Sequence, residues 1–503
     1  MNYIIQADNS NINIEGVSFE SNVLINATTF LASNTSNIII LDFYCEQIEF
    51  YQNFFSLMNS NASLKNLTIL SNFFFSNFIY AFNYFQSQFL IEFNISNSTF
   101  SQNVFDSEGI ILIGLQNVTI QDSYFYFNNF SLLFEISNTE NVLFQNSKFS
   151  NNEGGLIKVE NVILLEFYLL FIKNCQSNNN FTVFLLNSIN QIMIISCLFE
   201  QNQGIYSVDD GLSNGYSAVI YLDNTNLDSS YVIIEQSIFL GNQGILDNSS
   251  EVSGCGTFLM ETGTIEIKNS SFESNVASHW TICLEIRADE ISIIECSFVN
   301  NSYLKVTDDP ENMIAGTILA DFNNFTLSFS NFSLNQADDG TCLLIYQGSA
   351  FQSQNFWGYS LNFIGNIAYD STNIFYVSGD TLERIFVFEN SYFSNGISQS
   401  GSGLFFFETI PGDFFQNYSF YNCFFSKNQG ASDGSFFDHY PSDPINCFIY
   451  IEDSYFINNT VSGAAISNSE GIIFDVWGEF LDVSDLSIYA IETKNCHFSG
   501  NIS

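Results

Sequence analysis

The chain has 503 residues, of which 46% are hydrophobic, 13% are charged and only 4 are Pro. Low hydrophobicity is the usual mark of disorder, so this composition excludes a disordered chain and indicates a large core. The 10 Lys and Arg stand against 53 Asp and Glu, a net charge of −43. A polyanion of this size repels nucleic acid, so no nucleic-acid partner is expected.

A repeat built around Phe-x-x-Asn begins near the N-terminus. Phe50, Phe74, Phe100, Phe125 and Phe149 follow one another at intervals of 24, 26, 25 and 24 residues. Later units recur at intervals of 26 to 34, with one doubled gap of 62 residues between Phe363 and Phe425. We assign the missing unit in that gap to Tyr392 with Asn395. Regular spacing of this kind indicates a repeat architecture.

The clearest copy of the repeat is VTIQDSYFYFN, residues 118–128. Val118 and Ile120 alternate inward, Asp122 is expected at a turn, and Ser123 and Phe125 point inward again. Short alternating strands that meet at polar corners predict an all-β chain. The residues expected to stack in interior ladders are Phe100, Phe125, Phe149, Phe199, Phe239, Phe272 and Phe298, with Asn103, Asn128, Asn152 and Asn202.

A period near 25 residues with three short strands per turn predicts a right-handed parallel β-helix of about 17 coils. We expect one domain over residues 1–503, with tight coils at 1–202 and coils carrying longer projecting loops at 203–503. The repeat is cut off near Asn501, and neither end shows a capping segment. The sequence is therefore expected to be a fragment, uncapped at both ends, of a longer chain.

A second signal follows many Phe-x-x-Asn units, where Gly and small residues precede an apolar strand, as in GGLIKV at Gly154 and GAAIS at Gly463. With this pairing the chain resembles the polymorphic outer membrane protein repeats of chlamydiae, which combine FxxN with GGA[I/L/V]. It is also similar to the wider pectin-lyase-like β-helix superfamily. The resemblance covers nearly the whole chain through short motifs; it implies the fold, and an adhesin or surface role.

The loops after residue 202 contain acidic pairs, among them Asp209–Asp210 and Asp338–Asp339, each followed directly by Gly. A Gly after two Asp residues is first a turn signal. These four carboxylates are also the candidate ligands for a Ca²⁺ ion. No cofactor other than Ca²⁺ is expected.

Lyases of the pectin-lyase-like fold need an Arg or Lys base beside Ca²⁺-binding carboxylates, and hydrolases need paired carboxylates. The chain has two Arg, Arg287 and Arg384, and three scattered His, His279, His439 and His497. The sequence therefore favours a non-catalytic scaffold over the alternative, a carbohydrate-active enzyme or glycan-binding protein. Three or more carboxylates with an Arg on one face would favour that alternative.

Five Cys are assigned to one register, two residues before the repeat Phe: Cys175, Cys197, Cys296, Cys423 and Cys496. For Cys175 this requires Ser177 in place of the Phe. Ser fills the slot elsewhere, so buried free thiols are expected.

Outward Tyr residues that precede the repeat Phe form a candidate stripe for stacking sugars: Tyr124, Tyr392 and Tyr455.

The chain contains 17 Asn-x-Ser/Thr sequons, and the candidates for glycosylation include Asn94, Asn117, Asn269 and Asn331. No signal peptide or membrane-spanning segment is evident in this sequence. We expect an extracellular or cell-surface protein whose partners are glycans or other surface proteins. Because its acids repel one another, its melting temperature should rise with ionic strength and more steeply with millimolar Ca²⁺.

Overall fold

The computed structural model describes most of the chain. The described residues are 2–20, 24–25, 28–83, 91–177, 183–206, 216–217, 219–224, 229–246, 254–255, 258–277, 281–303, 316–337, 340–346, 353–369, 375–378, 383–399, 404–409, 415–430, 437–441, 446–461, 474–476 and 489–501. These residues form strands and no helix, which confirms the all-β prediction. They divide into two compact units, Met1–Ser249 (unit 1) and Ser250–Ser503 (unit 2).

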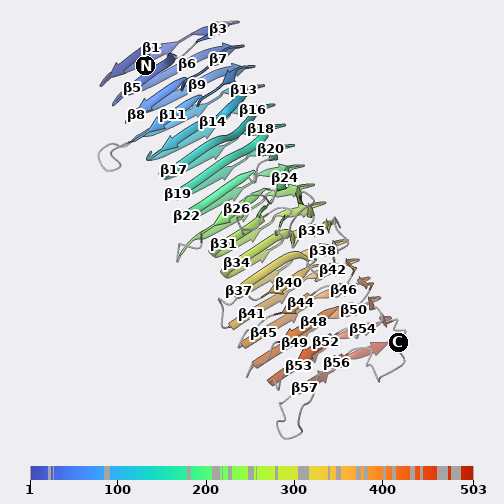
Figure 1. The fold of residues 1–503 in the computed structure, drawn as a ribbon. Helices are drawn as coiled ribbons and strands as arrows, with labels where there is room; N and C mark the ends of the chain where they lie inside the picture. Colours follow the sequence, from blue (N-terminus) through green and yellow to red (C-terminus); the bar gives the residue numbers. More distant parts are fainter. Residues whose placement is uncertain are drawn as a thin grey trace. The chain divides into compact units, whose positions relative to one another are not determined.

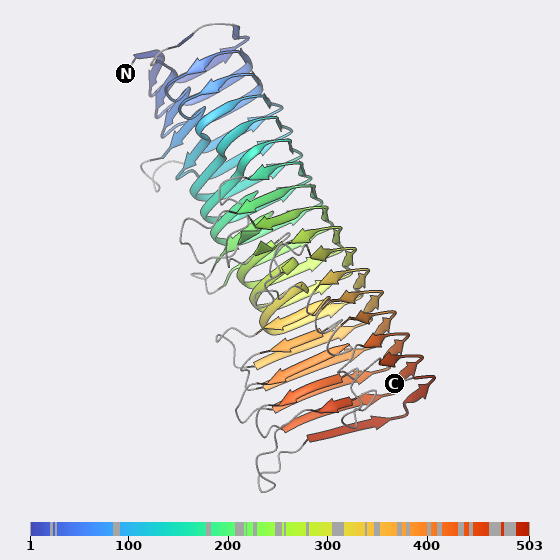
Figure 2. The ribbon, with the colours of Figure 1, turned by 45° about the vertical axis from the view of Figure 1, so that its right-hand side comes forward.

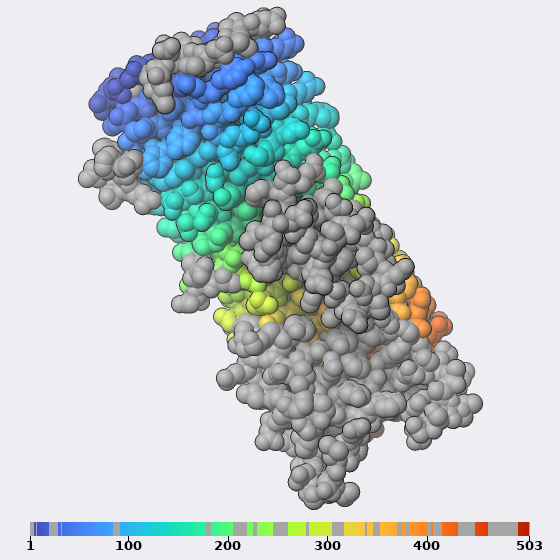
Figure 3. All heavy atoms as spheres, in the orientation of Figure 1, coloured from blue at the N-terminus to red at the C-terminus, as the bar shows by residue number. Residues whose placement is uncertain are grey.

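Unit 1 is built from parallel strands in which each short strand pairs with its counterpart from the next repeat (Figures 1 and 2). The strands that hold the repeat Phe position are β13 (Thr99–Ser101), β16 (Tyr124–Tyr126), β18 (Lys148–Ser150), β20 (Phe171–Lys173), β23 (Leu198–Glu200) and β28 (Ile238–Leu240). Figure 3 shows the described atoms of this unit in successive colour bands, because residues close in sequence lie in the same layer.

The repeat Phe stack ring on ring in the interior of unit 1. Phe100, Phe125 and Phe149 pair in register, with ring centroids 4.9 Å apart at each step. Phe199 and Phe239 continue the pattern with centroids 4.8 Å apart. All five rings are buried. Stacked rings at the strand spacing let each repeat bury its apolar face against the next.

Asparagine side chains form a second buried ladder. Asn128 donates from Nδ2 to the Phe100 carbonyl at 3.0 Å and to Asn152 Oδ1 at 3.1 Å. Its own Oδ1 accepts from the backbone N–H and the Nδ2 of Asn103. The ladder therefore satisfies backbone and amide groups that would be costly to bury unpaired.

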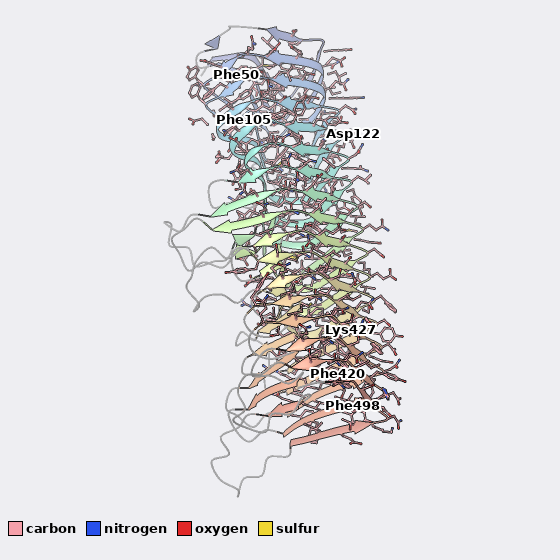
Figure 4. The ribbon with its side chains drawn as sticks, turned by 90° about the vertical axis from the view of Figure 1, so that its right-hand side faces the viewer. Phe50, Phe105, Asp122, Phe420, Lys427 and Phe498 are labelled. Atoms are coloured by element: carbon pink, nitrogen blue, oxygen red, sulfur yellow. The ribbon has the colours of Figure 1, made fainter. Side chains whose placement is uncertain are left out.

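The corners of the repeat are turns in the left-handed region. Asp122 has φ 51° and Asn151 has φ 53°, and Asn and Asp tolerate this conformation better than other non-Gly residues. Figure 4 shows Asp122 at the outer edge of unit 1. The corner predicted at Asp122 is thus present, with Val118, Ile120 and Phe125 turned inward and buried beside it.

Unit 2 repeats the same arrangement. Its Phe strands are β32 (Ser271–Glu273), β35 (Ser297–Val299), β38 (Asn331–Ser333), β42 (Asn362–Ile364), β46 (Tyr392–Ser394), β50 (Phe424–Ser426), β54 (Tyr455–Ile457) and β58 (His497–Ser499). Phe272 and Phe298 are buried and stack with centroids 4.9 Å apart. The longer strands of this unit include β31 (Phe258–Lys268), β34 (Thr281–Ile294), β37 (Gly316–Ser328), β41 (Ser353–Tyr359), β45 (Glu383–Glu389) and β49 (Phe415–Tyr421).

The assignment of Phe50 and Phe74 to the main Phe ladder was wrong. Phe100 pairs with Ile69, whereas Phe74 pairs with Phe50 and Phe105 in a separate column of stacked rings. Figure 4 shows Phe50 and Phe105 on the same side of unit 1. The repeat between Asn72 and Asn103 is 31 residues long, and this hid a change of column behind an even Phe spacing.

Two further register assignments also need correction. Ile172, not Ser177, fills the Phe position between Phe149 and Phe199. Cys175 therefore occupies the Asn position: its backbone N–H donates to Asn202 Oδ1 at 3.1 Å. Because Ile172 and Cys175 stand where other repeats have Phe and Asn, the Phe-x-x-Asn motif is absent from the sequence of this repeat.

The repeat missing between Phe363 and Phe425 is centred on Phe393, not on Tyr392. Gly396 then stands at the Asn position, where its backbone N–H donates to Asn428 Oδ1 at 3.0 Å. Asn395 lies at the corner with φ 52°.

Candidate functional site

Charged side chains meet on the outer face of unit 2, where β31, β34 and β37 run side by side. The register places Arg287 between Glu261 and Asp321. Arg287 Nη1 lies 2.7 Å from Glu261 Oε1, and Arg287 Nε lies 3.6 Å from Asp321 Oδ2. The Arg287 side chain is 51% exposed, whereas that of Asp321 is only 7% exposed. One guanidinium therefore bridges two carboxylates across three strands.

Glu285 adds a third carboxyl group to this cluster, which we call the Arg287 cluster. It lies two residues before Arg287 on β34, and in register beside buried Leu319. Its Oε2 is enclosed and has no hydrogen-bond partner among the described residues. Burial raises the pKa of Glu285 to about 7; the charge of Arg287 opposes this rise and that of Glu261 adds to it. Glu285 is therefore largely protonated below neutral pH, beside carboxylates that pair with an arginine.

A protonated carboxyl group near an ionised one is the arrangement that glycoside hydrolysis uses, as acid and as base or nucleophile. Glu285 and Glu261 lie two residues apart along the strand and one strand apart in register, so their Cα atoms are about 8 Å apart. Among the described residues, no group of three or more His, Cys, Asp or Glu could hold a metal ion. Glu285, with its raised pKa, and the neighbouring Glu261 supply the two carboxyl groups that acid–base chemistry needs.

The sequence did not single out Glu261, Glu285 or Asp321. These residues occupy outward positions in strands whose loops differ in length, and outward acids are common in a chain of charge −43. The only signal in the sequence was the alternation of Glu285 and Arg287 on one strand face.

Arg384, the second arginine, lies in a buried polar column of unit 2. Gln354, Arg384 and Gln416 pair in register on β41, β45 and β49, and all three are at most 1% exposed. Tyr418 donates its hydroxyl to Gln416 Oε1 at 2.7 Å. Arg384 is thus placed inside, away from Arg287, and the two arginines do not share a site.

The predicted Ca²⁺ ligands lie outside the described residues; these are Asp209, Asp210, Asp338 and Asp339. His279 also lies outside them, and His439 lies on β52 (Phe437–Pro441). His497 is exposed. Its strand, β58, pairs with β54, whereas the Arg287 cluster lies on β31, β34 and β37.

Four of the five cysteines assigned to one register are buried, namely Cys175, Cys197, Cys296 and Cys423, while Cys496 is partly exposed. All five thiols are free. Burial raises the pKa of Cys197 to about 12. It also raises the pKa of Cys175 to about 11, where hydrogen bonds from Asn152 and other groups only partly oppose the rise. Thiols held protonated in this way are poor nucleophiles.

Of the outward Tyr residues, Tyr124 is 51% exposed and Tyr455 is 46% exposed. Tyr392 is half-buried and stacks on Phe424, with ring centroids 5.1 Å apart. One face of the Tyr392 ring is therefore covered by the ring of Phe424 on the neighbouring strand, β50.

Among the four candidate sequons, Asn269 is exposed at a corner with φ 47°. Asn94, Asn117 and Asn331 are half-buried on strands. Asn117 accepts a hydrogen bond from Asn141 at 2.9 Å, and Asn331 donates to Ser333 at 3.2 Å. Asn269 is thus the most accessible of the four.

No protein-family model matches the chain, and no curated protein matches it. Among solved structures, the chain is similar to a PL6 family alginate lyase, AlyGC, with 9% identity and a TM-score of 0.24 over 100% of this chain and 96% of that chain. A mutant of the same lyase matches with 10% identity and a TM-score of 0.17, over 98% and 96% of the two chains. Likeness at this level carries no argument about function. Within the described part of the chain, no helix could span a membrane.

Proposed function

We propose that this protein is a non-catalytic repeat scaffold with a structural or adhesion role, built as a right-handed parallel β-helix of about 17 coils. The same repeat of stacked Phe and Asn recurs in both units. Its partners are glycans or other surface proteins.

The observation that carries this proposal is how the buried polar side chains are used. Asn103 and Asn128 each donate to the Asn of the next repeat, and Asn152 donates to the backbone carbonyl of Phe125. The serines at the preceding corner are used in a similar way. Ser123 accepts from the Ser98 N–H and donates to the Gln121 carbonyl. These side chains stabilise the stack and are not free for chemistry. A chain that devotes its repeat to stacking neighbours gains length and surface.

An extracellular or cell-surface location agrees with the net charge of −43 and with the exposed sequon at Asn269. The test is mass spectrometry of the protein isolated from its native source. A glycan on Asn269 is expected, and unmodified sequons throughout would contradict this location.

The lack of catalysis is tested with the full chain incubated with polygalacturonate, alginate and neutral glycans, with and without Ca²⁺. No products are expected. Product formation that disappears in Arg287→Gln or Arg384→Gln would overturn the scaffold proposal.

The second candidate function is carbohydrate-active, and the Arg287 cluster favours it. Its three carboxyl groups and one Arg on a single face are the arrangement that distinguishes this alternative from a scaffold. Glu285, with its raised pKa, would act as the acid, and Glu261 or Asp321 as the base or nucleophile. Hydrolysis of a neutral glycan that falls at least about 100-fold in Glu285→Gln, and is unchanged in the exposed control Glu290→Gln, would establish this function.

A further inference from the structure

Three exposed aromatic side chains gather on the outer face of unit 2 where β37 and β41 pair. Trp357 is 43% exposed, Tyr359 is 39% exposed, and Phe329, directly after β37, is 56% exposed. The rings of Phe329 and Tyr359 touch edge to face, with centroids 5.3 Å apart. We call these three residues the aromatic platform.

The local backbone holds the platform in place. Trp357 and Tyr359 are alternate residues of β41, so both point outward from one strand. Gly358 between them faces the core, where a Cβ atom would lie 2.9 Å from Leu361 Cδ1 and 3.0 Å from Phe388 Cδ1. The strand is thus pressed against the core, and the two outward rings are positioned by a packed backbone.

Phe329 is costly to the fold in two ways. It has φ 50° at a corner where Asn97, Asn146 and Asn269 stand in other repeats. A bulky residue in the left-handed region is strained, and its exposed ring gains little from the hydrophobic effect. Leu169 has a similar φ of 53° and is 54% exposed, so what distinguishes Phe329 is its ring contact with Tyr359.

The surroundings of the platform leave the rings open and add polar groups at the rim. Trp357 lies in register between Thr326 and Val387, which are both small. Tyr359 lies beside Glu389, which is exposed. Flat apolar faces bordered by a hydroxyl group and a carboxylate fit a ligand with apolar C–H faces and hydroxyl edges.

We propose that the aromatic platform binds an uncharged polysaccharide by stacking on its sugar rings. The chain carries −43 charges and Glu389 borders the platform, so anionic glycans and anionic lipid surfaces are repelled. Three side chains are too few for a stable protein interface, which needs about 800 Å² from each partner. This binding rests on the proposed function, of which it names one class of glycan partner, and it does not depend on the Arg287 cluster.

The test is co-sedimentation of the full chain with three insoluble neutral glycans: cellulose, chitin and β-1,3-glucan. Retention is expected on at least one of them, and Trp357→Ala should weaken it about tenfold, as expected for loss of a central aromatic contact. Phe415→Ala is the matched control, since Phe415 on β49 is an aromatic residue of the same unit that is 38% exposed, and this variant should bind as the parent chain does.

A second pair of variants separates binding from folding. Phe329→Asn relieves the strained corner, so it should raise the melting temperature by about 2 °C while weakening retention. Leu169→Asn makes the same change at a unit 1 corner, where Leu169 has φ 53° and is 54% exposed. It should raise the melting temperature and leave retention unchanged.

Absence of retention on all three glycans would overturn the proposal, and so would retention that survives Trp357→Ala. Loss of retention in Tyr455→Ala would assign binding to the Tyr stripe instead. Stronger binding to soluble polygalacturonate in affinity electrophoresis would contradict the uncharged ligand. None of these results bears on whether the chain is a non-catalytic scaffold, which the product assays decide.

Discussion

Units 1 and 2 share one ladder but differ in what else they bury. Among the described residues of unit 1, the buried polar side chains are Ser, Thr and Asn, and none is charged. Unit 2 buries Asp321 and Arg384 as well, together with Gln354 and Gln416. Burying charge is costly unless it is paired. The repeat as unit 1 uses it therefore needs no buried charge, and the buried charges of unit 2 are additional to the shared ladder.

The largest effect should come from the ladder, and it should be the same in both units. Phe125→Ala and Phe298→Ala each leave a cavity in a stack of buried rings, so each should lower the free energy of unfolding by about 3–5 kcal/mol. Urea denaturation measures both. A cost below about 1 kcal/mol in either unit would show that its ladder is not a packed core.

The Asn ladder should be nearly as sensitive. Asn128→Ala leaves the side-chain amide of Asn103 and the carbonyl of Phe100 without their hydrogen-bond partner. We therefore expect the free energy of unfolding to fall by about 3 kcal/mol. Asn301→Ala in unit 2, where Asn301 Nδ2 donates to Asn335 Oδ1 at 3.0 Å, should cost about the same. The control is Asn129→Ala, because exposed Asn129 donates only to Glu153 at the surface and should cost less than about 0.5 kcal/mol.

The Arg287 cluster gives unit 2 a pH dependence of its own. Glu285 has a raised folded-state pKa of about 7, so the folded state holds the proton more tightly than the unfolded state. Its contribution to stability is thus fully present below the unfolded pKa and is lost as pH rises from about 4.5 to 7. Because the side chain is only partly enclosed, we expect Glu285→Gln to be about 2 kcal/mol more stable than the parent at pH 8 and equal to it at pH 4.5.

Denaturation curves across this pH range measure the difference. Glu290→Gln on the same strand is exposed and should follow the parent chain at every pH. A constant offset between Glu285→Gln and the parent from pH 4.5 to 8 would contradict the raised pKa.

The smallest effect is expected at Arg287 itself. Because its side chain is 51% exposed, Arg287→Gln should cost only about 1 kcal/mol, and less at 1 M NaCl. A double-mutant cycle with Glu261→Gln measures the pair directly. Coupling above about 3 kcal/mol would mean that the cluster is a structural element of unit 2 and not an addition to it.

The interior was predictable where the motif is intact. Phe125 and Asn128 could be placed inward from the alternation and spacing of one repeat. Phe74 was misplaced because the repeat that follows is longer, and Cys175 because Ile172 replaces the Phe that marks the register. Both errors arise from the same cause: spacing along the chain does not report which residues become lateral neighbours.

The outer face was much less predictable. Glu261, Arg287 and Asp321 are 26 and 34 residues apart, and they meet because three strands pair in register. Trp357 and Phe329 likewise become neighbours through the pairing of β37 with β41. Neither group has a motif, because outward residues are not constrained by the ladder.

The sequence by itself determined that the chain is all-β, that its Phe and Asn face inward in a repeat, and that most of its acids face outward. These properties follow from alternation and period, which are local. Only the tertiary structure decided that Glu285 loses enough water to hold its proton near neutral pH, and that Arg384 lies in the interior while Arg287 lies outside. Solvation and charge pairing depend on neighbours from other repeats, and loops of unequal length decide which neighbours those are.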